Sequence, residues 1–169
     1  MAMEGLGRVL DISQGWTPQD FHADGITGAW VSLKRASGVL FVVQFKAGTS
    51  GANATLTLQE ATDAAGDGNQ DLAVIDHYYL KKHSTPTDDL TGVEVWAEVT
   101  QDAAATVTAT AADYELLAIP VLADQLDAGF SYLNLSAGTT ADAQYASSLA
   151  ILHDLLEQRA PASLAAPGA

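Results

Sequence analysis

The sequence has no cysteine and little positive charge. Without cysteine, disulfides and thiolate metal sites are excluded, so apolar packing alone must hold the core. Only 7 Lys and Arg accompany 21 Asp and Glu, and the formal net charge of −14 repels phosphate backbones and anionic lipid. We therefore expect neither nucleic acid nor a membrane as a partner, and synthesis in a reducing cytoplasm.

Long apolar runs are also missing. The longest run, at residues 39–43, is far too short to span a bilayer, and no basic segment followed by an apolar one marks a secretory signal. The 169 residues suffice for one domain with a sizeable core. We expect a single soluble domain.

Short alternating segments separated by Gly, Pro, Asp and Asn predict an all-β chain. Residues 39–43 are apolar on both faces, which indicates a strand with packing above and below, and residues 55–60 alternate as a half-buried strand does. With the glycine-containing segment 47–54 between them, they predict a hairpin at the centre of the fold. Further strands are expected at 8–13, 29–33, 76–83, 93–99, 106–110, 114–119 (ended by Pro120) and 130–136.

This pattern predicts an antiparallel β-sandwich, jelly-roll-like or related, with extended terminal arms. Residues 1–28, a strand and a long surface loop from 14 to 28, form the first arm. Residues 29–158 form the sandwich, and residues 159–169 form an extended tail rich in Pro and Ala. The segment 141–159 fits both a helix and a strand, and propensity alone favours the helix.

No established catalytic or metal-binding pattern is present. The four histidines lack ligand spacing, and neither a nucleophile elbow nor a phosphate-binding glycine loop occurs. Asp63, Asp67, Asn69 and Asp71 partly match a calcium loop, but Ala65 and Val74 replace two of its carboxylates. We expect a turn whose Asp and Asn cap their own backbone, with calcium as the alternative. Paired carboxylates such as Asp124 and Asp127 are expected to be solvated loop charges rather than a glycosidase site.

Two kinds of residue are candidates for binding a partner. Trp16 is the one tryptophan in the predicted loop, where its ring could contact a protein or stack on a sugar, whereas Trp30 and Trp96 lie in predicted strands. Pro161, Leu164 and Pro167 lie in the tail, where prolines reduce the entropy lost when an extended arm is ordered on a neighbour. We expect no cofactor and no catalytic residue.

Residues 56–68 read LTLQEATDAAGDG, and further points of likeness are residues 114–119, 122–127 and the strand from Phe130. In these segments the sequence resembles a group of tailed-bacteriophage virion decoration proteins, which stabilise (cement) capsids. The resemblance implies a strand over residues 145–152, a Pro/Ala tail and a virion role. It carries over no functional residues.

The sequence therefore predicts a non-enzymatic structural protein on the outer surface of a phage capsid. Its partners would be the major capsid protein and further copies of itself, as a trimer or dimer, joined by largely apolar contacts with weak salt dependence. The alternative is a carbohydrate-binding β-sandwich module for host or glycan attachment.

Overall fold

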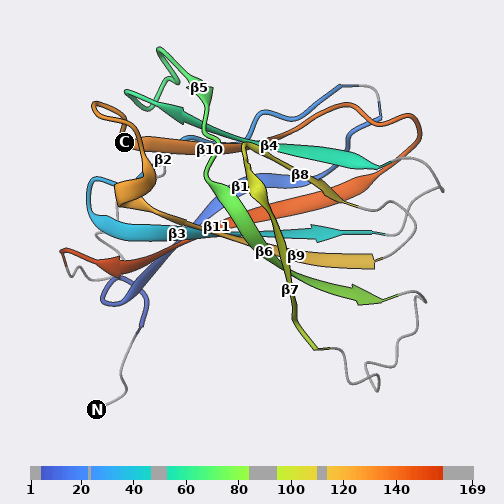
Figure 1. The fold of residues 1–169 in the computed structure, drawn as a ribbon, viewed down its shortest axis with the longest axis horizontal. Helices are drawn as coiled ribbons and strands as arrows, with labels where there is room; N and C mark the ends of the chain where they lie inside the picture. The colour runs from blue at the N-terminus through green and yellow to red at the C-terminus, as the bar shows by residue number, and fades with distance from the viewer. Residues whose placement is uncertain (1–4, 23, 47–52, 84–94, 110–113, 158–169) are drawn as a thin grey trace.

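The chain folds into two antiparallel sheets that pack face to face (Figure 1). A computed structural model describes residues 5–22, 24–46, 53–83, 95–109 and 114–157. Sheet A has the order β1-β11-β3-β9-β6-β7, and sheet B consists of β2, β10, β4, β5 and β8. The strands are β1 (Leu10–Asp20), β2 (Val31–Ser32), β3 (Ala36–Phe45), β4 (Ala54–Ala61), β5 (Gln70–Asp71), β6 (Ile75–His83), β7 (Ala97–Ala104), β8 (Thr106–Ala109), β9 (Tyr114–Leu122), β10 (Tyr132–Ala137) and β11 (Tyr145–Leu155). The predicted β-sandwich is confirmed.

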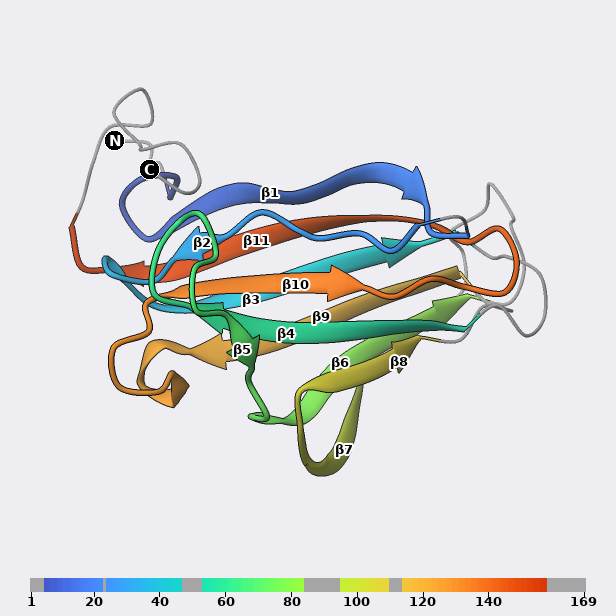
Figure 2. The same cartoon turned by 90° about the horizontal axis from the view of Figure 1, so that it is seen from above.

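The strand order is that of a jelly roll, in which one long hairpin folds over on itself. With β6, β7 and β8 set aside, β1 pairs with β11, β2 with β10, β3 with β9 and β4 with β5. The pairs β11-β3 and β10-β4 then complete the two sheets. Figure 2 shows this arrangement, with sheet A running from β1 through β11, β3 and β9 to β6 and β7.

Alternation along the strands builds the core between the sheets. On β3 the side chains of Val39, Phe41, Val43 and Phe45 are buried, and on β4 those of Leu56 and Leu58 are buried. β9 and β10 add Leu117, Ile119, Val121, Leu133 and Leu135 to the same cluster. Neighbouring residues on each strand point the other way, so one side of each sheet faces away from this core.

The predicted hairpin between residues 39–43 and 55–60 is wrong. β3 pairs with β11 and β9 in sheet A, whereas β4 pairs with β10, β5 and β8 in sheet B. The chain from residue 46 to residue 53 is long enough to cross the gap of about 10 Å between packed sheets. The two strands therefore bury their apolar sides against each other across the core, although each is central in its own sheet, as predicted.

The predicted surface loop at residues 14–28 is also wrong in its first half. β1 continues to Asp20 because register shifts between Gln14 and Trp16, and between Trp16 and Gln19, accommodate Gly15 and Pro18. Such bulges let an edge strand tolerate glycine and proline without losing its pairing. Residues 10–20 of the expected arm are thus a strand of the sandwich.

The segment that fits both a helix and a strand forms a strand. Residues 145–155 form strand β11, so the helix favoured by propensity is wrong and the strand implied by the resemblance is confirmed. Pairing on both sides, with β1 and β3, overrides the intrinsic preference of this segment for a helix.

Pro120 does not end β9, although the sequence predicts that it does. β6 pairs with β9 only as far as Ala118, so the missing N–H of Pro120 disturbs no partner there.

The expected one-face-buried strand at residues 93–99 is only partly right. Strand β7 begins at Ala97, and Val95 before it is 77% exposed. Residues 93 and 94 lie outside the described residues. The strand expected at 76–83 is confirmed as β6, and the one expected at 106–110 is confirmed as β8 over residues 106–109, with residue 110 outside the described residues. In the described part of the chain, no helix is long and apolar enough to cross a membrane.

Candidate functional site

The side of sheet A that faces away from the core is the strongest candidate for a functional surface. On β11, Ala146, Ser148, Ala150 and Leu152 are buried toward the core, so the residues between them point outward. The register extends this assignment to the neighbouring strands, because Ile12 lies opposite Ile151, Ile151 opposite Leu40, and Leu40 opposite Pro120. We call this surface the outer face. It comprises Leu10, Ile12 and Gln14 of β1, Ser147, Leu149, Ile151 and His153 of β11, Gly38, Leu40, Val42 and Gln44 of β3, and Leu116, Ala118, Pro120 and Leu122 of β9.

The outer face is mostly apolar and lies open. Ile12 is 50% exposed, Leu149 is 45% exposed and Leu122 is 46% exposed. Tyr79 of β6 lies opposite Ala118 and continues the surface toward β7. No described element covers the outer face. Monomeric proteins rarely leave an apolar patch of this kind open unless it binds something.

The outer face also contains no carboxylate. The chain has 21 Asp and Glu, yet none occupies an outward position between Gly38 and Gln44 on β3, between Leu116 and Leu122 on β9, or between Ser147 and His153 on β11. Carboxylates lie at its margins, where Asp154 contacts His153 at 2.9 Å and Glu98 of β7 is opposite Tyr79, and elsewhere on the protein. Depletion of charge over an apolar centre is the composition of a protein–protein interface.

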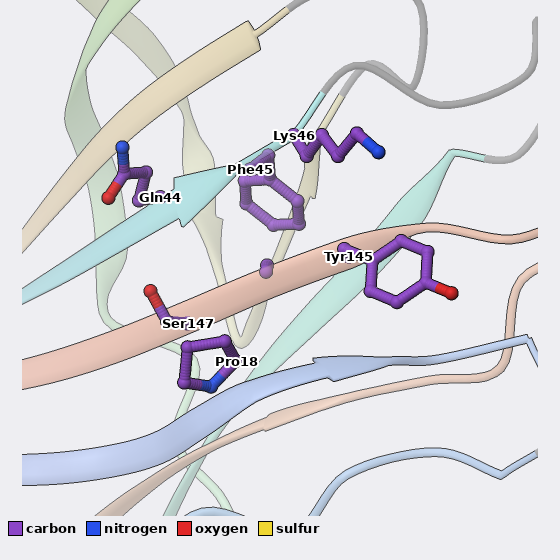
Figure 3. Close-up of a pocket in the computed structure, with 7 residues that line it drawn as sticks. Pro18, Gln44, Phe45, Lys46, Tyr145 and Ser147 are labelled. Atoms are coloured by element: carbon purple, nitrogen blue, oxygen red, sulfur yellow. The ribbon is translucent and has the colours of Figure 1, made fainter.

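A shallow hollow of about 380 Å³ adjoins one end of the outer face. It is lined by Pro18 of β1, by Tyr145, Ala146 and Ser147 of β11, and by Gln44, Phe45 and Lys46 at the end of β3 (Figure 3). The Lys46 Nζ lies 5.5 Å from the centre of the Tyr145 ring, a cation–π contact. The hollow offers an amide, a hydroxyl and an ammonium group beside an apolar floor, which could receive one protruding side chain of a partner.

Hydrogen bonds of Gln144 and Asp20 fix the backbone beside this hollow. The Gln144 Nε2 donates to the Lys46 carbonyl at 2.7 Å, and the Gln144 backbone N–H donates to Asp20 Oδ1 at 2.9 Å. The His22 N–H donates to the same oxygen at 3.1 Å. Desolvation raises the pKa of Asp20, but these hydrogen bonds outweigh it and hold the pKa below the ordinary value of 3.8.

This arrangement predicts a pH-dependent contribution from Asp20 to stability. A folded-state pKa below the unfolded value means that the carboxylate stabilises the fold above about pH 4, and that the effect is lost as the pH falls through the lowered pKa. Asp20→Asn should therefore destabilise the protein at about pH 6 and have no such effect at about pH 2. Urea unfolding of both proteins across this range measures the difference. A difference that does not change with pH would contradict the assignment.

The residues of the possible calcium loop are engaged in hydrogen bonds within the protein. Asp63 Oδ1 accepts hydrogen bonds from the backbone N–H groups of Ala65 at 2.9 Å and Asp67 at 3.0 Å. The Asn69 side chain donates to the Gly66 carbonyl, and Asp71 accepts from the Gln59 amide. The contacts of Asp63 and Asn69 are those of a turn whose Asp and Asn side chains bind their own backbone. No group of three potential metal ligands occurs among the described residues.

Trp16 is a core residue and not a surface contact. It is 4% exposed in β1, and its ring meets Phe21 edge-on with centroids 6.1 Å apart. The expectation that Trp16 binds a protein or a sugar at the surface is therefore wrong, because the bulges of β1 turn the indole inward. Trp96 is the most exposed of the three tryptophans, at 47%. Pro161, Leu164 and Pro167 lie outside the described residues.

Of the two carboxylates expected to be solvated loop charges, Asp127 takes part in hydrogen bonds within the protein and Asp124 is exposed. Asp127 Oδ2 accepts a hydrogen bond from the Gln70 amide, and the Asp127 backbone N–H donates to Glu60, whose side chain is buried. Asp124 is exposed in a short 3-10 turn, Ala123–Gln125.

His77 contacts Asp76 at 2.6 Å, and His153 contacts Asp154 at 2.9 Å, each pair adjacent in sequence. Neither pair lies beside the hollow or beside a nucleophile among its lining residues.

No protein-family model, curated protein or solved structure matches this chain. The resemblance to decoration proteins therefore stays a prediction.

The outer face is not predicted from the sequence, although a signal for it is present. Residues 39–43 are apolar on both faces, and the structure covers only one of the two.

Proposed function

We propose that this chain is a non-enzymatic structural protein of a phage virion, which binds the major capsid protein and stabilises the outer surface of the shell. The observation that carries the proposal is the outer face, an open apolar surface without carboxylates on a protein of net charge −14. Such a surface serves contact with protein and offers no machinery for a reaction.

The distribution of charge supports a role in assembly. Carboxylates outside the outer face keep copies of the protein, and particles that display it, apart in solution. A jelly roll also supplies two rigid sheets, so an interface on one sheet does not require the protein to change shape. The virion role is taken from the resemblance of residues 56–68 to decoration proteins.

In this proposal the tail makes part of the contact with the shell. Deleting residues 161–169 should leave the thermal midpoint of the isolated protein unchanged and reduce its occupancy on capsids, because an extended arm adds backbone hydrogen bonds and buries Leu164. Electron microscopy of particles with and without the protein, together with quantification of bound chain, measures this.

The matched control keeps the length of the tail. A variant with Pro161→Ser, Leu164→Ser and Pro167→Ser retains the backbone and loses the apolar and stiffening groups. It should show intermediate occupancy. If the full chain does not bind particles at all, the virion role is wrong; if the deletion binds as well as the full chain, only the role of the tail is wrong.

A further inference from the structure

We infer that the hollow beside Lys46 is a carboxylate-binding pocket, and that it receives a glutamate side chain of the protein that covers the outer face. The inference rests on the proposed function, because it takes a protein to be the partner. The volume of the hollow, about 380 Å³, is at the lower end of the range for pockets that bind small molecules. This size suits one side chain with its stem.

Four side chains arrange the hollow as two rows. Ser147 of β11 lies directly opposite Gln44 of β3. Two positions along each strand lie Tyr145 and Lys46, where the Lys46 N–H donates to the Tyr145 carbonyl at 2.9 Å. Residues two apart on a strand point to the same side, about 6.6 Å from each other. Figure 3 shows the neutral polar row of Gln44 and Ser147 at one end of the hollow, and Lys46 and Tyr145 at the other.

The ammonium group of Lys46 selects an anionic occupant. None of the residues that line the hollow is acidic, and within the described ranges no carboxylate forms an ion pair with Lys46. The nearby Asp20 carboxylate accepts hydrogen bonds from the N–H groups of Gln144 and His22 and from the Tyr145 side chain. On a chain of net charge −14, a cation that no carboxylate of the chain neutralises is complementary to a carboxylate of the partner.

The distance between the two rows suits glutamate better than aspartate. Three C–C bonds of about 1.5 Å each separate the carboxylate of glutamate from its backbone, and aspartate has one bond fewer. A glutamate carboxylate at Lys46 therefore places the adjoining peptide group beside the Gln44 amide and the Ser147 hydroxyl. In the described part of the chain, neither of these two side chains forms a hydrogen bond with another residue. The methylene groups of the stem would lie against Pro18 and the Tyr145 ring.

The ammonium end of the hollow is held in place without a partner. The Lys46 carbonyl accepts a hydrogen bond from the Gln144 Nε2 at 2.7 Å, and Gln144 is buried. The Lys46 Nζ rests over the Tyr145 ring. Groups positioned in advance lose less conformational entropy when a ligand binds.

Chemical-shift titration of the isotope-labelled full chain tests the pocket with a small probe. The probe is the N-acetyl methylamide of glutamate, and the matched control is the same derivative of glutamine, which has nearly the same shape without the charge. We expect saturable shifts at Lys46, Tyr145 and Ser147 with the glutamate derivative at millimolar concentration. The glutamine derivative should bind about fivefold more weakly or less well still, because it forms no ion pair with Lys46.

Two lysines provide matched variants, since each rests on a tyrosine ring. The Lys34 Nζ lies 5.0 Å from the centre of the Tyr132 ring, and Lys34 does not line the hollow. Lys46→Glu should abolish the saturable shifts through repulsion between like charges, and Lys46→Arg should retain them. Lys34→Glu, which changes the net charge equally, should leave the affinity for the probe unchanged. Circular dichroism checks that all three variants are folded.

Three results of the titration would overturn the inference. The first is equal affinity for the glutamate and glutamine derivatives, and the second is a folded Lys46→Glu variant that binds the probe as the wild type does. The third is tighter binding of glucuronate than of the glutamate derivative, which would assign the hollow to an acidic sugar.

Occupancy on capsids separates this inference from the proposed function. Lys46→Glu should lower the occupancy about tenfold, and Lys34→Glu should not change it. Equal occupancy of Lys46→Glu and the wild type would overturn the inference and leave the virion role intact. A full chain that binds no particles would overturn the virion role, whereas the titration decides the carboxylate pocket in either case.

Discussion

Phe41→Ala is expected to lower the free energy of unfolding by about 3–5 kcal/mol. Phe41 is 1% exposed and lies opposite Ile119 on β9 and Ala150 on β11, at the centre of the layer between the sheets. Truncation removes the apolar contacts and leaves a cavity that the paired strands cannot close, because their backbones are fixed by the hydrogen bonds of sheet A. Urea denaturation followed by circular dichroism measures the loss.

The adjacent residue provides the control. Val42 points to the outer face and is half-buried, so Val42→Ala should cost about 1 kcal/mol or less when measured at a concentration too low for association. Equal losses of stability at positions 41 and 42 in the monomer would contradict the assignment of the two faces of β3.

Glu60→Ala is expected to destabilise the fold by about 2–4 kcal/mol. The Glu60 side chain is fully buried at the end of β4, where Oε1 accepts from the Gln70 amide at 2.7 Å and Oε2 accepts from the Asp127 backbone N–H at 3.0 Å. The Glu60 carboxylate therefore connects β4 both to β5 and to the turn before β10. Truncation removes the acceptor of the Asp127 N–H and leaves a cavity in the interior.

Asp71→Ala is the matched control, because Asp71 also accepts a side-chain hydrogen bond, from the Gln59 Nε2 at 3.0 Å, but on the exposed surface. Its loss should cost about 0.5 kcal/mol or less. Glu60→Gln, which keeps one acceptor oxygen, should lie between the two. If Glu60→Ala costs no more than Asp71→Ala, the buried carboxylate does not hold these segments together.

The sequence predicted the fold class because alternation reports burial. Leu56 and Leu58 alternate with Thr55 and Thr57, and the structure buries the leucines as expected. Alternation does not indicate which strands are neighbours. The predicted hairpin therefore pairs residues 39–43 with residues 55–60 in one sheet, although these strands belong to opposite sheets. In a jelly roll the partners of β3 are β9 and β11, which follow much later in the chain. Long-range pairing of this kind leaves no local signal.

The candidate site was predicted less well, for a related reason. Trp16 was placed at the surface because Gly15 and Pro18 look like loop residues, but β1 absorbs them as bulges and carries the indole into the core. The apolar residues of the outer face come from β1, β3, β9 and β11, and no one strand displays more than a few of them. The surface is visible only once the register places Ile12, Ile151, Leu40 and Pro120 in one row.

The most direct test of the outer face as a protein-binding surface is the accessibility of its methyl groups in the assembled protein. A soluble paramagnetic probe should relax the Leu149 methyls slowly, close to the rate of the buried Leu58, although Leu149 is 45% exposed in the single chain. The methyls of Val95, 77% exposed and away from the outer face, give the rate of a solvated side chain. Relaxation of Leu149 as slow as that of Leu58 is the predicted result, and relaxation of Leu149 as fast as that of Val95 would contradict the account.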